Sequence, residues 1–311
     1  MEKGNITTVF EFVLLDISSQ QDGHVLFVVF LIMYLITVLG NLTIIMAIRL
    51  NSHLLRTPMY FFLSNLSLVD ICFTTATVPK MLANTLSSVS KISYGGCLAQ
   101  MFFFIVFGMT DNLMLATMAL DRYMAICHPL HYATLMSNRV CKLLVAACWL
   151  VSHLHSLLHT LLMSRLSFFG SNHIPHFFCD VFPLLKISSS TTHLNTLAVH
   201  TEGALIVNGA LAFIAFSYAR ILMAVLRIPS IEGKRKAFST CGSHLTMVAM
   251  FYGTVIWVYF QPSSNFSPDN DAFAAIMYTM VTPMLNPFIY TLRNDKMKEA
   301  LRKIFSRKLN Y

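Results

Sequence analysis

The chain has 311 residues, of which 56% are hydrophobic and only 12% are charged, and its formal net charge is +8. Soluble globular domains are about 25% charged, so this composition excludes an ordinary soluble protein, whose surface it cannot cover. Together with a mean hydropathy of +0.63, it indicates a chain embedded in lipid.

The N-terminal segment, 1–23, is expected to precede the first membrane span. Asn5-Ile6-Thr7 matches the N-glycosylation acceptor pattern, so Asn5 is a predicted glycosylation site. The apolar stretch that follows is not a secretory signal. No basic residue directly precedes it, and it is longer than the apolar core of a signal peptide.

Seven stretches are long enough to cross a membrane as helices, for which about 20 mainly apolar residues are needed. Four of them contain long runs free of Asp, Glu, Lys and Arg, whereas the other three include Asp70, Asp111 and Glu202. The sequence predicts an all-α membrane protein with a seven-transmembrane helix bundle in one domain, 24–292. The predicted spans are 24–48, 58–82, 97–127, 141–164, 197–226, 237–260 and 271–292.

Lys and Arg are distributed unevenly between the two sides of the predicted bundle. Seventeen of the 22 fall on the side of the C-terminus, and only Lys3, Lys80, Lys91, Arg165 and Lys186 fall on the other. The positive-inside rule therefore places the C-terminus in the cytosol and the N-terminus outside. The net charge reflects this asymmetry and not a nucleic-acid partner, because no folded basic domain is present to bind one.

The seven cysteines are an odd number, so at least one is unpaired. Cys97 begins the third span and Cys179 lies in the long loop after the fourth, and both fall on the outer, oxidising side. A Cys97–Cys179 bridge would tie this loop over the third helix. The other five lie in helices or near the cytosol and are expected to be small buried residues: Cys72, Cys127, Cys141, Cys148 and Cys241.

The chain contains neither the GxxxxGK[ST] nor the GxGxxG nucleotide-binding motif, and we expect that it is not an enzyme. His155 and His159 lie one helical turn apart and could chelate a metal ion, although packing or interfacial snorkelling is the more common reason for such a pair. His176 and Cys179 have a similar spacing, but the expected disulfide uses the cysteine.

Five motifs occur in order along the chain and together resemble the vertebrate olfactory receptors, which are rhodopsin-like G-protein-coupled receptors. They are PMYFFLSNLSLVDIC (58–72), MALDRYMAICHPLHY (118–132), SYARIL (217–222), KAFSTCGSHL (236–245) and PMLNPFIYTLRN (283–294). The segment HFFCDVFPLLKIS (176–188) resembles the tetrapod type with a long second extracellular loop. The resemblance implies a plasma-membrane receptor that binds a small volatile odorant and activates a stimulatory olfactory-type G protein, which raises cAMP.

Asp121 and Arg122 form a charged pair at the predicted cytosolic end of the third helix, where Arg122 can reach the interface and avoid the hydrocarbon. The resemblance implies a switch, in which local polar contacts hold Arg122 until it is released to contact the G protein. A plain interfacial anchor pair is the alternative. The resemblance adds four residues to the switch: Tyr218, His244, Asn286 and Tyr290.

Asp70 and Asp111 each lie about 12 to 14 residues from a helix end, or roughly 18–21 Å at the helical rise, and therefore near the bilayer midplane. Ionisable residues at that depth indicate a functional site. The resemblance implies that Asp70, with Asn286 nearby, holds a sodium ion. Two close carboxylates either share a proton or bind a cation. The alternative is a pair of protonated acids hydrogen-bonded to Asn41 and Asn286.

The predicted ligand pocket follows one stripe of the third helix and, by resemblance, matching positions on helices five, six and seven. The stripe has helical spacing, but ordinary helix packing also produces such stripes. An apolar pocket with a few polar groups suits a small, weakly polar ligand. The predicted residues are Met101, Phe104, Ile105, Gly108, Met109, Asn112, Val199, Glu202, Gly203, Ile206, Phe251, Tyr252, Val255, Tyr259, Ile276 and Thr279.

The C-terminal segment, 293–311, is predicted to form a short amphipathic cytoplasmic helix on the inner leaflet. Its apolar face contains Met297, Leu301, Ile304 and Phe305, and basic residues surround that face. No cysteine follows Cys241, so binding to the membrane is expected to depend on apolar burial and on attraction to anionic lipid.

One departure from the family concerns the loop after the fourth span. Relatives with this loop type carry two further cysteines, and the matching positions here are Phe169 and Ser189. We therefore expect Cys97–Cys179 to hold the loop alone. Packing of four phenylalanines is expected to replace the second bridge: Phe168, Phe169, Phe177 and Phe178.

Two alternatives to an odorant receptor stay open at this point. A channel or transporter would require inverted repeats or broken helices, and the sequence displays neither. A chemoreceptor of the same fold, which binds a small metabolite in a non-olfactory tissue, would have the same sequence features.

Overall fold

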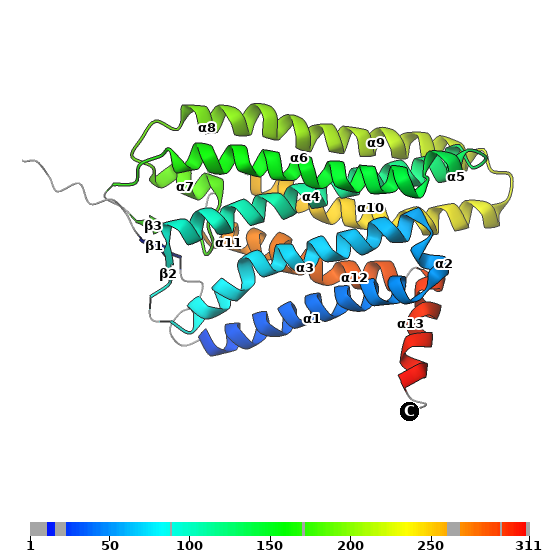
Figure 1. Cartoon of the computed structure of the whole chain (residues 1–311), viewed down its shortest axis with the longest axis horizontal. Helices are drawn as coiled ribbons and strands as arrows, with labels where there is room; N and C mark the ends of the chain where they lie inside the picture. The colour runs from blue at the N-terminus through cyan, green and yellow to red at the C-terminus, as the bar shows by residue number, and fades with distance from the viewer. Residues whose placement is uncertain are drawn as a thin grey trace, which may run out of the picture.

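The computed structural model describes residues 11–15, 23–87, 89–169, 172–259, 268–292 and 294–308. Long helices run side by side, and the last helix, α13 (Asp295–Lys308), crosses one end of the bundle (Figure 1). The predicted glycosylation site at Asn5 lies outside the described residues, as do the side chains of Tyr259, Ile304 and Phe305.

Within those ranges, seven long helical segments form the bundle, and shorter helices lie at its ends. The long segments are α1 (Gly23–Leu50), α3 (Pro58–Thr85), α4 (Tyr94–Cys127), α6 (Asn138–Ser164), the run of α8 (His193–Ala198), η1 (Val199–Gly203) and α9 (Ala204–Leu226), then α10 (Ile231–Tyr259), and the run of α11 (Pro268–Ile276), η3 (Met277–Val281) and α12 (Thr282–Leu292). The short helices are α2 (Ser52–Leu55), α5 (Tyr132–Leu135) and α7 (Val181–Ile187). The segments η1 and η3 are single π-helical turns within the fifth and seventh spans.

Among the described residues, six of the long segments have the length and composition to cross a membrane. The bundle also exposes many large apolar side chains, among them Leu39, Leu150 and Leu205. Apolar surface of this extent indicates contact with lipid, which confirms the predicted class of membrane protein.

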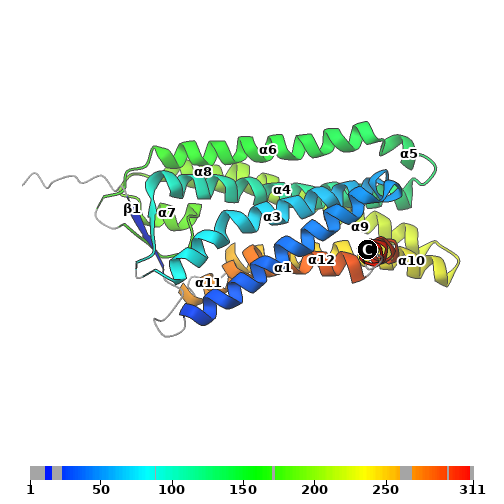
Figure 2. The ribbon, with the colours of Figure 1, turned by 60° about the horizontal axis from the view of Figure 1, so that its bottom comes forward.

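Helix α4 lies at the centre of the bundle, in contact with α3, α6, α9 and α10 (Figure 2). Its buried residues run from Cys97 at one end to Arg122 near the other. A helix that is surrounded by neighbours needs buried residues along several faces. Because of this central position, α4 supplies residues to the predicted pocket, to the pair of buried acids and to the Arg122 switch described below.

Helices α1 and α12 approach each other closely at a glycine. A Cβ atom at position 40 would lie 3.1 Å from Cγ of Pro287, so a side chain there would require the proline ring to shift by a few tenths of an ångström. The neighbouring Asn41 donates hydrogen bonds to the carbonyls of Thr37 and Pro283, at 3.0 and 3.2 Å. Asn41 therefore joins α1 to α12 and does not bond to either buried acid.

A small three-stranded sheet covers one end of the bundle, which we call the loop end. Strand β1 (Glu11–Leu14) pairs antiparallel with β2 (Lys91–Ser93) and parallel with β3 (His173–Ile174). Phe12 and Leu14 of β1 are buried, and the Phe12 ring meets the edge of Phe168 at 5.2 Å. The sequence-based prediction of a purely helical chain did not include this sheet, because strands of two to four residues have no readable periodicity.

The opposite end, which we call the tail end, contains α2, α5 and α13. Asn294 accepts a hydrogen bond from the backbone N–H of Met297 at 3.1 Å and one from the Tyr60 hydroxyl at 3.0 Å. Met297 and Ala300 are buried in the main core of the bundle. The expected amphipathic helix is present, but part of its apolar face packs on the other helices and not on lipid.

Candidate functional site

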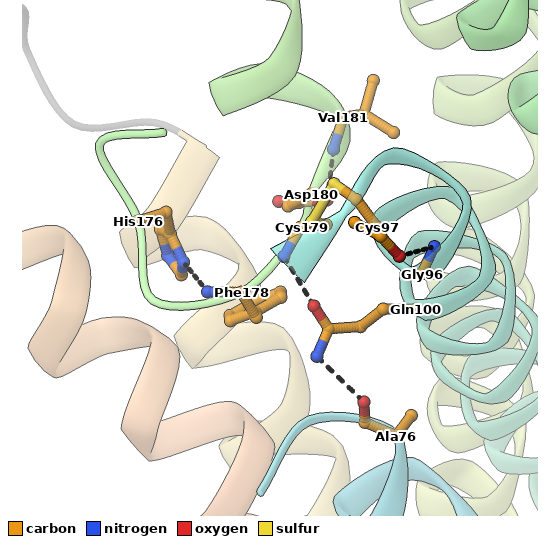
Figure 3. The surroundings of a disulfide bond; sticks show 10 residues. Ala76, Gly96, Cys97, Gln100, His176, Phe178, Cys179, Asp180 and Val181 are labelled. Atoms are coloured by element: carbon orange, nitrogen blue, oxygen red, sulfur yellow. Dashed lines mark hydrogen bonds between the residues drawn. A yellow bond between two sulfur atoms is a disulfide. The ribbon is translucent and has the colours of Figure 1, made fainter. Parts of the chain in front are cut away.

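A disulfide closes the loop end (Figure 3). Cys97 at the start of α4 is bonded to Cys179, 82 residues further along the chain, as predicted. Gln100, one turn along α4, accepts a hydrogen bond from the backbone N–H of Cys179 at 3.0 Å and donates one to the Ala76 carbonyl of α3 at 3.1 Å. Gln100 thus attaches the loop to two helices, a role that the sequence did not indicate.

The five other cysteines are unpaired. Cys141, Cys148 and Cys241 are buried, as predicted, whereas Cys72 and Cys127 are only partly buried. The prediction is wrong for these two because Cys127 is the last residue of α4 and Cys72 lies beside the buried face of α3.

The two positions at which the family resemblance implies a second cysteine pair lie next to each other. The Phe169 backbone N–H donates to the Ser189 hydroxyl at 2.9 Å, and that hydroxyl donates to the Phe169 carbonyl at 2.9 Å. Phe168, Phe177 and Phe178 are buried as expected, but Phe169 is 43% exposed. The predicted packing of Phe169 is therefore wrong, since a hydrogen-bonded serine holds this part of the loop.

This geometry predicts the result of restoring the second bridge. We expect the double variant Phe169→Cys/Ser189→Cys to form a second disulfide and to raise the free energy of unfolding by about 2 kcal/mol. Either substitution alone should lower the surface level, because a single extra thiol can pair wrongly with Cys97 or Cys179. Non-reducing peptide mapping and thermal unfolding measure both effects. A double variant that is no more stable than the wild type would contradict the expectation.

Burial shifts the pKa values of two ionisable residues of this loop in opposite directions. Burial lowers the pKa of His176 to about 4, and Lys186 acts in the same direction. The neutral ring also accepts a hydrogen bond from the Phe178 backbone N–H at 3.4 Å. Burial raises the pKa of Asp180 to about 6, against the opposing effect of the hydrogen bond from the Val181 N–H.

The His176 shift predicts a loss of stability in acid. The pKa of His176 is lower in the folded protein than in the unfolded chain, so acid favours the unfolded chain. The contribution of His176 to the free energy of unfolding is complete above about pH 6.5 and is lost as the pH falls towards 4. The total loss is up to roughly 3 kcal/mol. Asp180 has the opposite sign, since its stabilising effect grows as the pH falls through 6. We expect the melting temperature to fall less between pH 7.5 and 5 in His176→Asn than in the wild type. His173→Asn, an exposed histidine of the same loop, is the control and should keep the wild-type slope; equal slopes in all three proteins would contradict the assignment.

The predicted pocket stripe of α4 faces an aromatic cluster near the loop end. The Phe104 ring lies 5.1 Å from Phe73, 4.8 Å from Phe178 and 6.0 Å from Tyr278. A Cβ atom at Gly108 would lie 3.4 Å from Phe73, so the backbone of α4 passes close to that ring. The cluster combines residues of α3, α4, η3 and the disulfide-bonded loop, and three of its rings were not among the predicted pocket residues.

A hydrogen bond connects Asn112, a polar residue of the α4 stripe, to the sixth span. The Tyr252 hydroxyl of α10 donates to Asn112 Oδ1 of α4 at 2.6 Å, and the Asn112 amide contacts the Met109 sulfur at 3.9 Å. Asn112 and Tyr252 are both buried. Two predicted pocket residues on different helices are thus brought into direct contact.

The other predicted pocket residues take different positions. Glu202 and Gly203 face His155 of α6, and the Glu202 carboxylate accepts hydrogen bonds from that histidine. Thr279 donates to the Ala275 carbonyl within its own helix at 2.6 Å. Partly or fully buried positions are found for Met101, Ile105, Val199, Ile206, Phe251, Val255 and Ile276.

The two buried acids lie in the middle of the bundle. Both Asp70 carboxylate oxygens accept hydrogen bonds from the Asn286 amide, at 3.0 and 2.9 Å. Among the described residues, Asp111 Oδ1 and Asn286 Oδ1 are buried without a hydrogen-bond partner. Carboxylate and amide oxygens form a donor set for a hard cation, and oxygens that lack a partner are the atoms that such an ion would satisfy.

At the tail end, Arg122 is held in place by its neighbour. Its guanidinium is hydrogen-bonded to Asp121, by Nε at 3.0 Å and also by Nη2, and the Tyr132 hydroxyl donates to Asp121 Oδ1 at 2.7 Å. Arg122 is 8% exposed and Asp121 is 1% exposed. The buried arginine is thus paired and its carboxylate partner is fixed by α5, which is a contact that the motif alone did not reveal.

A second group of switch residues joins three helices. His244 of α10 bonds through Nε2 to the Leu115 carbonyl of α4 at 3.0 Å, and through Nδ1 to the Tyr218 hydroxyl of α9 at 2.7 Å. Because only the protonated ring nitrogen can donate to a carbonyl, Nε2 carries the proton and Nδ1 accepts from the tyrosine. The Tyr290 hydroxyl of α12 contacts the Met118 sulfur of α4 at 3.8 Å.

The architecture of the bundle corresponds to a known class. The crystal structure of squid rhodopsin matches with a TM-score of 0.67, over 95% of this chain and 88% of that chain, at 20% sequence identity. The fold is therefore that of the rhodopsin-like G-protein-coupled receptors.

Sequence comparison then narrows the class. The family model described as "Olfactory receptor" matches residues 30–308. Olfactory receptor 1f45 of Rattus norvegicus is 57% identical over 307 residues, 98% of both chains. Olfactory receptor 1F1 of Homo sapiens is 55% identical over 308 residues, 99% of this chain and 98% of the relative. The chain belongs to the olfactory receptor family, and it is a multi-pass membrane signalling receptor and not an enzyme.

Proposed function

We propose that the protein binds a small, volatile, weakly polar odorant within the bundle and activates a stimulatory olfactory-type G protein, which raises cAMP. It would act in the plasma membrane with the N-terminus outside and the tail end in the cytosol. The excess of Lys and Arg on the side of the C-terminus supports this orientation. In that orientation the aromatic cluster around Phe104 is near the outer surface and Arg122 faces the G protein.

The observation that supports the proposal best is that α10 is attached to α4 at two levels. Tyr252 bonds to Asn112 near the predicted pocket, and His244 bonds to Leu115 nearer the tail end. The two α10 residues lie eight positions apart, which is about 12 Å along a helix. A ligand that disturbs the bond between Tyr252 and Asn112 can thus move the whole of α10, and with it the bond between His244 and Leu115.

This arrangement suggests how binding would be coupled to signalling. An odorant between Phe104 and Tyr252 would compete for the Asn112 amide and favour a displaced α10. Displacement would break the bonds of His244 to Leu115 and Tyr218, and the freed Tyr218 would become available to Arg122. A ligand shifts such an equilibrium only through its different affinities for the two states.

A cAMP assay with a panel of odorants in transfected cells tests the proposed function. We expect at least one small, weakly polar odorant to raise cAMP in cells that express the receptor and not in mock-transfected cells. Tyr252→Phe, which removes only the hydroxyl group, should change the half-maximal concentration for that odorant. Responses that use a different second messenger, with cAMP unchanged, would contradict the proposed G-protein class.

We also propose that a sodium ion binds at Asp70, Asp111 and Asn286. The two buried oxygens without a partner, on Asp111 and Asn286, support this site. A cation would also offset the repulsion between the two carboxylates, which would otherwise favour protonation of one of them. Bound sodium would connect α3, α4 and α12 and so favour the present arrangement of the helices.

The sodium proposal predicts a change in basal signalling. In Asp111→Asn, the sodium concentration that half-suppresses basal cAMP should rise about tenfold, equivalent to about 1.4 kcal/mol of binding free energy. The control is Asp295→Asn, which removes the same charge from the exposed start of α13. If the sodium dependence of Asp111→Asn equals that of the wild type at the same surface level, Asp111 does not bind the ion.

A further inference from the structure

Three ionisable side chains meet between the fourth and fifth spans, away from the switch and the paired acids. His155 and His159 lie one turn apart on α6, are 8% and 4% exposed, and have ring centroids 4.5 Å apart. Glu202 of η1 lies opposite them. Its carboxylate is 2.8 Å from His155 Nδ1 and 3.4 Å from His159 Nε2.

The local structure holds these groups in place from both sides. The Ser156 hydroxyl donates to the Phe102 carbonyl of α4 at 2.7 Å, which fixes the rotation of α6 so that its two histidines face the fifth span. Glu202 belongs to a single π-helical turn, and such turns occur frequently at functional sites. A Cβ atom at the adjacent Gly203 would lie 3.6 Å from His155 Cε1, so the backbone of η1 passes close to the imidazole.

The donor set suits a transition-metal ion. Two imidazole nitrogens and one carboxylate oxygen are the protein ligands of several zinc sites, and a histidine pair at i and i+4 on one helix face is a known chelating arrangement. The ligand atoms of the three residues all lie within 4.8 Å of one another. In a tetrahedral zinc site these atoms are about 3.3 Å apart, given zinc–ligand distances of about 2.0–2.2 Å. Small side-chain rotations would therefore close the site around an ion.

The surroundings favour a metal ion over a simple ion pair. Within the described part of the chain, Glu202 forms ion pairs with these two histidines and with no Lys or Arg. Both Glu202 carboxylate oxygens share the single His155 Nδ1, at 2.8 and 2.9 Å, and the 3.4 Å contact of His159 is long for a hydrogen bond. One divalent ion would satisfy both rings and the carboxylate together.

We propose that His155, His159 and Glu202 bind one divalent transition-metal ion of the zinc class, with a fourth position open to water or to an external ligand. The ion would connect α6 directly to the π-helical turn of the fifth span and stabilise that contact. This proposal does not depend on the odorant or G-protein assignment, because the site is tested by metal binding alone. Imidazole ligands also distinguish it from the all-oxygen set of Asp70, Asp111 and Asn286.

Metal titration of the purified full-length receptor in detergent tests the site. We expect the wild type to bind one zinc ion and its melting temperature to rise with the zinc concentration, with no comparable effect of magnesium or calcium, which prefer oxygen ligands. His159→Ala and Glu202→Gln should each weaken zinc binding by at least about tenfold. The matched controls are His153→Ala on α6 and His200→Ala on η1, which are exposed histidines on the same two elements and should bind zinc as the wild type does.

A second measurement keeps the test independent of the folding of the variants. Cobalt bound to the wild type should give the visible absorption of a tetrahedral nitrogen and oxygen site, and added zinc should remove it. The proposal is overturned if the wild type shows no zinc-dependent stabilisation up to about 1 mM, a limit that corresponds to about −4 kcal/mol of binding free energy. It is also overturned if His159→Ala binds zinc as tightly as the two control variants.

Discussion

Replacing Arg122 by alanine should abolish the odorant-evoked rise in cAMP while the receptor still reaches the cell surface. Arg122 is buried and bonded to Asp121, and Asp121 is also held by Tyr132. In the variant no guanidinium is left to be released towards the G protein. The predicted effect is thus a loss of coupling and not of ligand binding.

The structure also suggests how the Arg122→Ala experiment should be controlled. In this variant the buried Asp121 carboxylate loses its arginine partner, and an unpaired buried charge is costly. Asp121 would keep its hydrogen bond from Tyr132, so the carboxylate retains one partner. Surface levels should therefore be measured alongside cAMP, and we expect them to fall by no more than about twofold. Arg139→Ala removes an exposed arginine at the same end of the bundle and should respond normally. An undiminished cAMP response of Arg122→Ala at equal surface level would rule out the switch role.

The second large effect is expected from Cys179→Ser, which should nearly eliminate the receptor from the cell surface. Cys179 forms the disulfide that closes the loop end, and a hydrogen bond to Ser189, not a second bridge, holds Phe169. Loss of a bridge across a long loop costs about 2–4 kcal/mol. No other disulfide is present among the described residues, so no second bridge would compensate for this loss.

Two comparisons make the Cys179→Ser result interpretable. Cys72→Ser removes a partly buried free thiol and should leave the surface level close to that of the wild type. Gln100→Ala removes the hydrogen bonds to Cys179 and Ala76 but leaves the disulfide intact, so its effect should be intermediate. Surface labelling and thermal unfolding give the order of the three variants. Normal surface delivery of Cys179→Ser would show that the bridge is dispensable.

The features that were predicted correctly depend on properties that a single segment carries by itself. A run of about 20 apolar residues must be helical in lipid, because its backbone polar groups have no other partner there. The seven spans and the amphipathic tail helix could be recognised from the pattern of apolar residues. The family motifs around Arg122 could be recognised from their residues alone. The Cys97–Cys179 bridge was also predictable, since the topology leaves only these two cysteines on the outer side.

Other features depend on which segments meet, and only the tertiary structure decided them. The side chain of Glu202 was predicted to face the ligand pocket, but it lies against His155 and His159, because the rotation of a π-helical turn is set by its neighbours. The strand Glu11–Leu14 acquires its conformation by pairing with two distant segments and not from its own sequence. The hydrogen bond between Asn112 and Tyr252 joins residues 140 positions apart. Local sequence determined each helix and its place in the membrane. Contacts between distant helices determined which polar side chains form sites. These contacts depend on the rotation and depth of each helix, which no single segment specifies.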